Sequence, residues 1–174
     1  PVWAAVQCEL AGANGITVHL RQDRRHINDR DVELLKQTVA CKLNLEMSLA
    51  DEIVAIAERL VPQQVTLVPE KRQELTTEGG LDCINNADRL KEVVGRMHEK
   101  KILVSAFIIP DAEQINAAAD AGCDAVELHT GMYANAVATQ DSCDEIKRLK
   151  AARDDSLARE LTVHAGHGLT YRNL

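Results

Sequence analysis

Six short runs of β-branched and other apolar residues recur along the chain and predict β-strands. They cover residues 15–20, 42–47, 64–70, 102–108, 125–131 and 161–168. Between them, residues 31–38, 50–60, 88–98 and 112–121 carry apolar side chains at helical spacing, and Asn28 and Asp111 are typical N-cap signals for two of these helices. The alternation of strand and helix predicts a parallel sheet with right-handed crossovers.

Alternate positions on most of these strands are polar, most clearly near the carboxyl ends. Residues i and i+2 of a strand share a face, so Thr17 points the same way as His19, and Asn44 the same way as Glu46. An open sheet would bury these groups under helices, at about 1–3 kcal/mol for each unpaired one. The pattern therefore favours an α/β fold of the (β/α)8 TIM barrel type, with the polar side chains in the barrel mouth.

The number of strands does not complete such a barrel. A (β/α)8 barrel usually needs about 200 residues or more, whereas this chain has 174. We therefore expect a barrel truncated to about six βα units, with the first and last strands missing from the sequence. In this interpretation residues 1–174 form a single (β/α) barrel domain that is incomplete at both ends.

Composition excludes several functional classes. The net charge is −7 and aromatic residues make up 2% of the chain, so it lacks the basic surface and stacking rings of nucleic-acid binders. No apolar run approaches the roughly 20 residues of a membrane span. The five cysteines are dispersed without a C-x-x-C pair, which is typical of reduced thiols. We expect a cytoplasmic protein that binds neither nucleic acid nor membranes.

Residues 19–26 form a basic segment at the end of the first predicted strand. Three arginines and one aspartate give it a charge of +2 with histidine neutral, which suits a phosphate held by guanidinium groups. Alternatively, the arginines pair with Asp23, Asp29 and Asp31 on a solvated loop. The position at a strand's carboxyl end, with His19 on the inward face, favours the phosphate site.

Glu46 is the last inward-facing residue of its predicted strand. Its sequence neighbours Leu45 and Met47 suggest partial desolvation, which would raise the pKa of Glu46 towards that of a general base. Alternatively, Glu46 is a structural carboxylate paired with Lys42 or Lys71.

Two glycine-containing loops follow predicted strands. Glycines flank His167, where exposed backbone N–H groups could bind an oxyanion or phosphate; the alternative is a tight turn. The polar segment 71–82, with Gly79 and Gly80, suits a lid that excludes water from the mouth, or a simple surface loop. A second polar loop is expected at residues 133–144.

A metal site is a further possibility, because six His and Glu side chains could line the barrel mouth: His19, Glu46, Glu127, His129, His164 and His167. The H-E-x-x-H signature is absent, and no lysine is expected on the inward face of a strand end, where a Schiff base would form. Acid–base catalysis by His and Glu, with anchored phosphates and no metal, is the simplest interpretation.

Five segments together resemble the pyridoxine 5′-phosphate synthase family: GITVHLRQDRRHI (15–27), LNLEM (43–47), LVPEKRQELTTEGGLD (67–82), ELHTGMYA (127–134) and HAGHGLTY (164–171). The resemblance extends over residues 1–174. It implies a (β/α)8 barrel that assembles into a homo-octamer and uses no metal or organic cofactor. It also implies condensation of 3-amino-2-oxopropyl phosphate with 1-deoxy-D-xylulose 5-phosphate into pyridoxine 5′-phosphate, phosphate and water.

The matched motifs imply a role for each site residue. His19 and Glu46 resemble proton acceptors, His167 resembles a proton donor, and Glu127 resembles a residue that stabilises a transition state. The implied substrate and phosphate contacts are Arg21, His26, Thr76 and Gly168. The choice of Thr76 over Thr77 rests on the resemblance alone.

Two other functions stay open. A different sugar-phosphate barrel enzyme, such as a metal-dependent epimerase or aldolase, would contain metal and lose activity with a chelator. An inactive fragment would bind phosphate without turnover.

Overall fold

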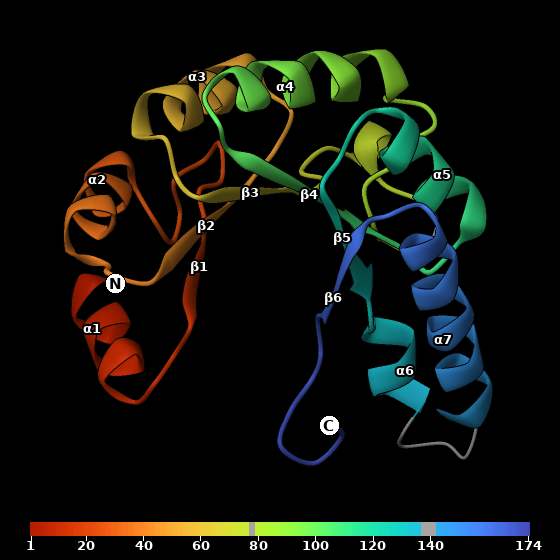
Figure 1. The fold of residues 1–174 in the computed structure, drawn as a ribbon. Helices are drawn as coiled ribbons and strands as arrows, with labels where there is room; N and C mark the ends of the chain where they lie inside the picture. The colour runs from red at the N-terminus through yellow and green to blue at the C-terminus, as the bar shows by residue number, and fades with distance from the viewer. Residues whose placement is uncertain (77–78, 137–141) are drawn as a thin grey trace.

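The computed structural model describes residues 1–76, 79–136 and 142–174. Six parallel strands form one sheet in the order in which they occur along the chain: β1 (Gly15–His19), β2 (Lys42–Met47), β3 (Gln64–Leu67), β4 (Leu103–Ile108), β5 (Ala125–His129) and β6 (Thr162–Gly166). The sheet curves into an arc with helices along its outer side (Figure 1). All six predicted strands are confirmed.

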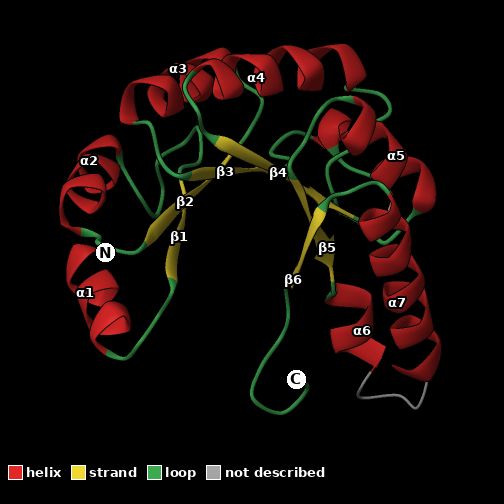
Figure 2. Cartoon of the chain, in the orientation of Figure 1, coloured by secondary structure: helices red, strands yellow, loops and turns green. Residues whose placement is uncertain are grey.

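Seven α-helices occur in the described part of the chain (Figure 2): α1 (Val2–Leu10), α2 (Asp29–Thr38), α3 (Asp51–Leu60), α4 (Ala87–Glu99), α5 (Ala112–Asp120), α6 (Gly131–Ala136) and α7 (Ser142–Ala158). A short 3-10 helix, η1, spans Arg72–Glu74. The four predicted helices correspond to α2 to α5, with bounds within two residues of those expected.

No bounds were predicted for three of the helices, α1, α6 and α7. The expected loop at 133–144 is wrong at both ends, because α6 and α7 extend into it; residues 137–141 lie outside the described residues. Helix α7 buries only Ala152 and Ser156, and α1 buries only Ala5. With so few buried positions, neither helix carries the apolar spacing that identifies a helix from sequence.

Both predicted N-caps are confirmed. The Asn28 side chain accepts a hydrogen bond from the Asp31 N–H (3.0 Å), and the Asp31 carboxylate accepts one from the Asn28 N–H (3.1 Å). The Asp111 carboxylate accepts hydrogen bonds from the first-turn N–H groups of α5. These caps satisfy backbone donors that a helix leaves unpaired and so fix where α2 and α5 begin.

The two faces of the sheet differ in character. The outer face packs against the helices through fully buried side chains such as Leu45, Val104 and Val126. The inner face carries a polar ladder, in which Thr66 Oγ1 donates to Asn44 Oδ1 (3.1 Å) and Asn44 Nδ2 donates to Thr17 Oγ1 (3.3 Å). The fold is therefore α/β, with six parallel strands forming a half-barrel whose inner face is polar, as the alternation predicted.

Candidate active site

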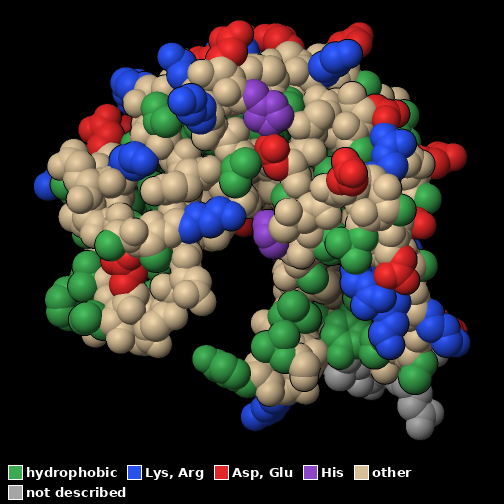
Figure 3. Space-filling view, viewed as in Figure 1, with side chains coloured by type: hydrophobic (Ala, Val, Ile, Leu, Met, Phe, Trp, Pro, Cys, Tyr) green, Lys and Arg blue, Asp and Glu red, His purple; other side chains and the backbone are tan. Residues whose placement is uncertain are grey.

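A pocket with a cavity volume of about 440 Å³ lies at the carboxyl ends of the strands. His19, Glu46, Glu127 and His167 all line it. Its remaining lining residues are Val68, Pro69, Leu75, Gly79 and Phe107. In the space-filling view, histidine and Lys or Arg side chains lie at the edge of the hollow enclosed by the arc (Figure 3). The four predicted catalytic residues, which come from four separate segments, therefore meet at one cavity.

His19 and Glu46 are paired across β1 and β2 by the register of the sheet. His19 Nδ1 lies 3.9 Å from Glu46 Oε2, and each side chain is 28% exposed. Leu45 and Met47 are fully buried in the core on the other face, so they do not flank the carboxylate as the sequence suggested. Among the described residues, the ion-pair partner of Glu46 is His19, and neither of the two lysines considered from sequence.

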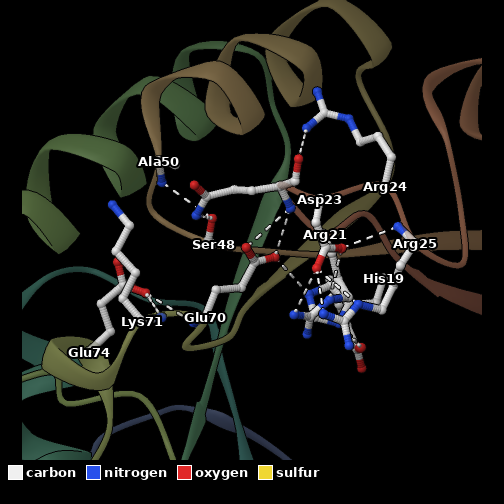
Figure 4. A network of polar contacts seen from close by, with 12 residues as sticks. His19, Arg21, Asp23, Arg24, Arg25, Ser48, Ala50, Glu70, Lys71 and Glu74 are labelled. Atoms are coloured by element: carbon white, nitrogen blue, oxygen red, sulfur yellow. Dashed lines mark hydrogen bonds and ion pairs between the residues drawn. The ribbon is translucent and has the colours of Figure 1, made fainter.

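A second carboxylate, that of Glu70, lies on the other side of His19. Glu70 Oε1 is 3.3 Å from His19 Nε2, and the Glu70 side chain is only 6% exposed. Both Glu70 oxygens accept from the Gln22 N–H, at 3.1 and 3.2 Å (Figure 4). Glu70 is the last residue of the predicted strand 64–70 and is not among the predicted site residues. Strand β3 ends at Leu67, so strand alternation does not reach this residue.

The arginines of the basic segment are paired with acidic side chains. Arg21 Nε lies 3.2 Å from Asp23, and Arg25 Nη2 lies 2.8 Å from the same carboxylate. The hydrogen bond from Arg21 holds the pKa of Asp23 well below its usual range. Arg24 pairs with Asp29 (2.9 Å) and also contacts Glu52. The alternative of ion-paired arginines is thus correct for Asp23 and Asp29.

The four predicted binding residues lie on three loops, those after β1, β3 and β6. Arg21 is half-buried and His26 exposed, both in the loop after β1. Thr76 Oγ1 accepts from the Gly80 N–H (3.0 Å) and closes the base of a turn; residues 77–78, within the predicted lid, lie outside the described residues. Gly168 follows His167 directly. None of these four lines the pocket.

Glu127 enters the pocket from β5. Burial raises the pKa of the Glu127 carboxyl, and the nearby Glu46 carboxylate raises it further. A Cβ atom at Gly166 would overlap the Glu127 carboxylate. Glycine at this position of β6 therefore leaves the space that the carboxylate occupies.

The His167 ring stacks on the ring of His129, with centroids 4.7 Å apart. His129 Nδ1 accepts from the Gly131 N–H (3.1 Å), which places the proton of a neutral His129 on Nε2. A Cβ at Gly131 would overlap the His129 ring. The sequence places His129 on the same strand face as Glu127, but the stacking of its ring on His167 is a contact that sequence cannot show.

The backbone at His167 is held in the left-handed region, with φ of 82°, which costs of order 1–3 kcal/mol for a residue other than glycine. The buried Thr130 hydroxyl lies 2.6 Å from Gly166 O and 2.7 Å from His167 O, so its one proton is shared between two carbonyls. Thr130 N–H also donates to Gly166 O (2.8 Å). These contacts stabilise the turn that presents His167.

Within 1–76, 79–136 and 142–174, no group of three or more His, Cys, Asp or Glu side chains is arranged to hold a metal ion. No helix in that part of the chain is long and apolar enough to cross a membrane.

Comparison with known families matches residues 1–174 to the family described as pyridoxal phosphate biosynthesis protein PdxJ. Proteins named pyridoxine 5′-phosphate synthase from Synechococcus sp. and Magnetococcus marinus are 56% and 54% identical to the whole chain, which covers 73% and 72% of their lengths. A third, from Trichlorobacter lovleyi, is 53% identical with 73% of its length covered.

Solved structures confirm the barrel architecture. D-psicose 3-epimerase from Clostridium cellulolyticum H10 aligns with a TM-score of 0.58 at 8% identity, over 95% of this chain and 67% of its own. Monomeric phosphoribosylanthranilate isomerase from Thermotoga maritima aligns with a TM-score of 0.53 at 10% identity, over 98% and 84%. At these identities the likeness shows the fold alone.

Proposed function

Because the chain belongs to the pyridoxine 5′-phosphate synthase (PdxJ) family of vitamin B6 biosynthesis, we propose that its pocket carries out that synthesis by acid–base catalysis. The substrates in this proposal are 3-amino-2-oxopropyl phosphate and 1-deoxy-D-xylulose 5-phosphate. The amine of one condenses with the ketone of the other, phosphate and water leave, and an aldol-type closure forms the ring. Each step moves a proton, which requires several groups that exchange protons.

The observation that carries the proposal is the convergence of His19, Glu46, Glu127 and His167 on one cavity. His19 and Glu46 accept protons from one side, and His167 donates a proton from the other. Glu127, whose pKa burial raises, holds a proton over a wider pH range than an exposed carboxyl and can donate a hydrogen bond to a developing negative charge.

Two phosphorylated substrates need anion sites beside these groups. Arg21 and His26 are the proposed contacts on the loop after β1, and Thr76 and Gly168 on the loops after β3 and β6. Arg21 is paired with Asp23, so a phosphate has to share or displace that carboxylate. The positive φ of Gly168 (77°) suits a turn whose backbone N–H groups face an anion.

The proposal also covers the domain organisation, the oligomeric assembly and the cellular location of the enzyme. Strands β1 and β6 lie at the two ends of the described sheet, which supports residues 1–174 as six units of one eight-stranded (β/α) barrel domain. Family membership supports assembly into a homo-octamer. The five cysteines are free thiols, in keeping with a cytoplasmic location.

Glu46→Gln tests the proposal. We expect kcat for pyridoxine 5′-phosphate formation, followed by its absorbance, to fall by about 10²–10⁴-fold, because the amide cannot accept a proton. Glu33→Gln is the matched control, since Glu33 is an exposed residue of α2 that pairs with Arg59; its kcat should not change. Undiminished turnover in Glu46→Gln contradicts the role of Glu46. Loss of activity with a chelator would instead favour a metal-dependent sugar-phosphate enzyme.

A further inference from the structure

The imidazole of His19 lies between two carboxylates that contact different ring nitrogens. Nδ1 is 3.9 Å from Glu46 Oε2, and Nε2 is 3.3 Å from Glu70 Oε1. The Nε2 atom is buried and, among the described residues, forms no hydrogen bond; its contact with Glu70 is a close ion pair without hydrogen-bond alignment. Since a buried ring nitrogen without a partner is costly, the Glu70 carboxylate is the group available to satisfy it.

Other contacts hold the Glu70 carboxylate in place independently of His19. Both of its oxygens accept from the Gln22 N–H, and the Gln22 side chain donates to Ser48 Oγ (3.1 Å). A side chain that is 6% exposed and whose two oxygens accept from one backbone N–H has little freedom to move. Its orientation is therefore set by the loops after β1 and β3, and the ring of His19 has to adapt to it.

This arrangement decides which nitrogen of a neutral His19 carries the proton. A neutral imidazole has one N–H donor and one acceptor, and a carboxylate only accepts. With Glu70 fixed beside Nε2, the proton is favoured on Nε2. The lone pair of Nδ1 is then left on the side of Glu46, which lines the cavity.

We propose that Glu70 is a positioning residue that orients His19 and selects its tautomer, with Nε2–H towards Glu70 and Nδ1 as the proton acceptor. When Nδ1 takes a proton from the substrate, the ring becomes a cation whose Nε2–H faces the Glu70 carboxylate, and the charge is stabilised until the proton is returned. The logic is that of a carboxylate behind a catalytic histidine. The inference rests on the proposed function, because it assigns His19 the role of a base.

Glu70→Gln, with Glu74→Gln as its matched control, tests this role. Glu74 belongs to the same loop and accepts from the Glu70 and Lys71 N–H groups, and the described structure shows no contact between it and His19. For Glu70→Gln we expect kcat to fall by about 10–100-fold, with KM within about threefold of wild type. Glu74→Gln should keep the wild-type kcat and KM.

The tautomer itself is read by long-range ¹H–¹⁵N spectra of histidine-labelled protein, assigned with His19→Asn. We expect Nε2–H in wild type and in Glu74→Gln, and loss of this preference in Glu70→Gln. Wild-type kcat with an unchanged tautomer in Glu70→Gln overturns the inference while leaving the proposed function intact. If wild type forms no pyridoxine 5′-phosphate, the proposed function fails, and the spectra still decide the tautomer. If Glu70→Gln does not fold, a wild-type His19 protonated on Nδ1 at neutral pH overturns the inference.

Discussion

The two walls of the pocket position their reactive side chains by different physical means. On the wall formed by β1, β2 and the loop after β3, the His19 ring lies 3.9 Å from the Glu46 carboxylate and 3.3 Å from the Glu70 carboxylate. Their positions follow from strand register and from hydrogen bonds to loop backbone. Turnover should therefore be sensitive to substitutions on this wall that change the charge of a side chain and keep its shape.

The wall formed by β5 and β6 depends on volume and backbone shape instead. Glu127 occupies space left by Gly166, and His129 occupies space left by Gly131. His167 lies on a left-handed backbone stabilised by Thr130. Turnover and stability should therefore be sensitive to one added methyl group or one lost hydroxyl on this wall, although neither change alters any charge.

Gly166→Ala is the sharpest test of that difference and carries the largest expected effect in this comparison. The added methyl group would overlap the Glu127 carboxylate, which is the flexible end of a side chain and can move away. We expect the free energy of unfolding to change by less than about 1 kcal/mol, while kcat falls by about 10²-fold, since a displacement of about 1 Å at a reacting group has that effect. Urea unfolding and steady-state kinetics on the same preparation separate the two.

Gly95→Ala is the control for the glycine substitution. Gly95 lies inside α4, where an added Cβ meets nothing within 4 Å. Alanine in a helix interior should stabilise the protein by about 0.5–1 kcal/mol, without an effect on kcat. Wild-type turnover in Gly166→Ala would show that Glu127 does not need its observed position.

Thr130→Val should have a smaller effect on turnover but a larger one on stability. It keeps the shape of the side chain and removes the hydroxyl that contacts Gly166 O and His167 O. We expect a loss of about 1–3 kcal/mol in the free energy of unfolding and a fall of about tenfold in kcat, because the strained turn no longer holds His167.

Ser156→Ala is the control that separates the effect of Thr130→Val on stability from its effect on kcat. The buried Ser156 hydroxyl donates to Ala152 O (2.7 Å) within α7, and neither residue lines the pocket. This variant should lose stability in urea and keep its kcat. Equal losses of kcat in both variants would mean that Thr130 acts only through global stability.

Much of the fold could be predicted from sequence because the relevant signals are local. Strand alternation separated the inner polar side chains, such as Asn44, from outer ones such as Leu45. The same alternation shows why Leu45 and Met47 cannot desolvate Glu46: they lie on the opposite face. The bounds of α7 could not be predicted because its buried face is too small to leave a periodic pattern.

The site residues that lie on strands could be predicted from alternation, whereas a loop residue needed another signal, such as the glycines that flank His167. His19, Glu46 and Glu127 lie on strands, so face and end could be inferred from spacing. Glu70 lies beyond the end of β3, and its contact with His19 depends on a loop path that no local pattern encodes. The selection of Thr76 came from family resemblance, and its hydroxyl here is bonded to Gly80.

The smallest expected effect is a pH dependence of stability that belongs to Glu127. Burial and the Glu46 carboxylate raise its pKa in the folded protein above the ordinary value of 4.5, so the folded state binds the proton more tightly than the unfolded state does. Stability is therefore lost as pH rises from the ordinary carboxyl range through the raised pKa, and is level above it. Glu127→Gln should abolish this loss, so its stability relative to wild type increases over that window.

Glu58→Gln is the control of opposite sign, because the Arg96 hydrogen bond lowers the pKa of Glu58. The free energy of unfolding of Glu58→Gln should be lower than that of wild type above the ordinary carboxyl range, and this difference should shrink as pH falls. Urea unfolding between about pH 3 and about pH 7, a range that extends below and above the ordinary carboxyl pKa, distinguishes the two variants; parallel curves for wild type and Glu127→Gln would show that the surroundings of the buried Glu127 carboxyl do not disfavour its ionisation.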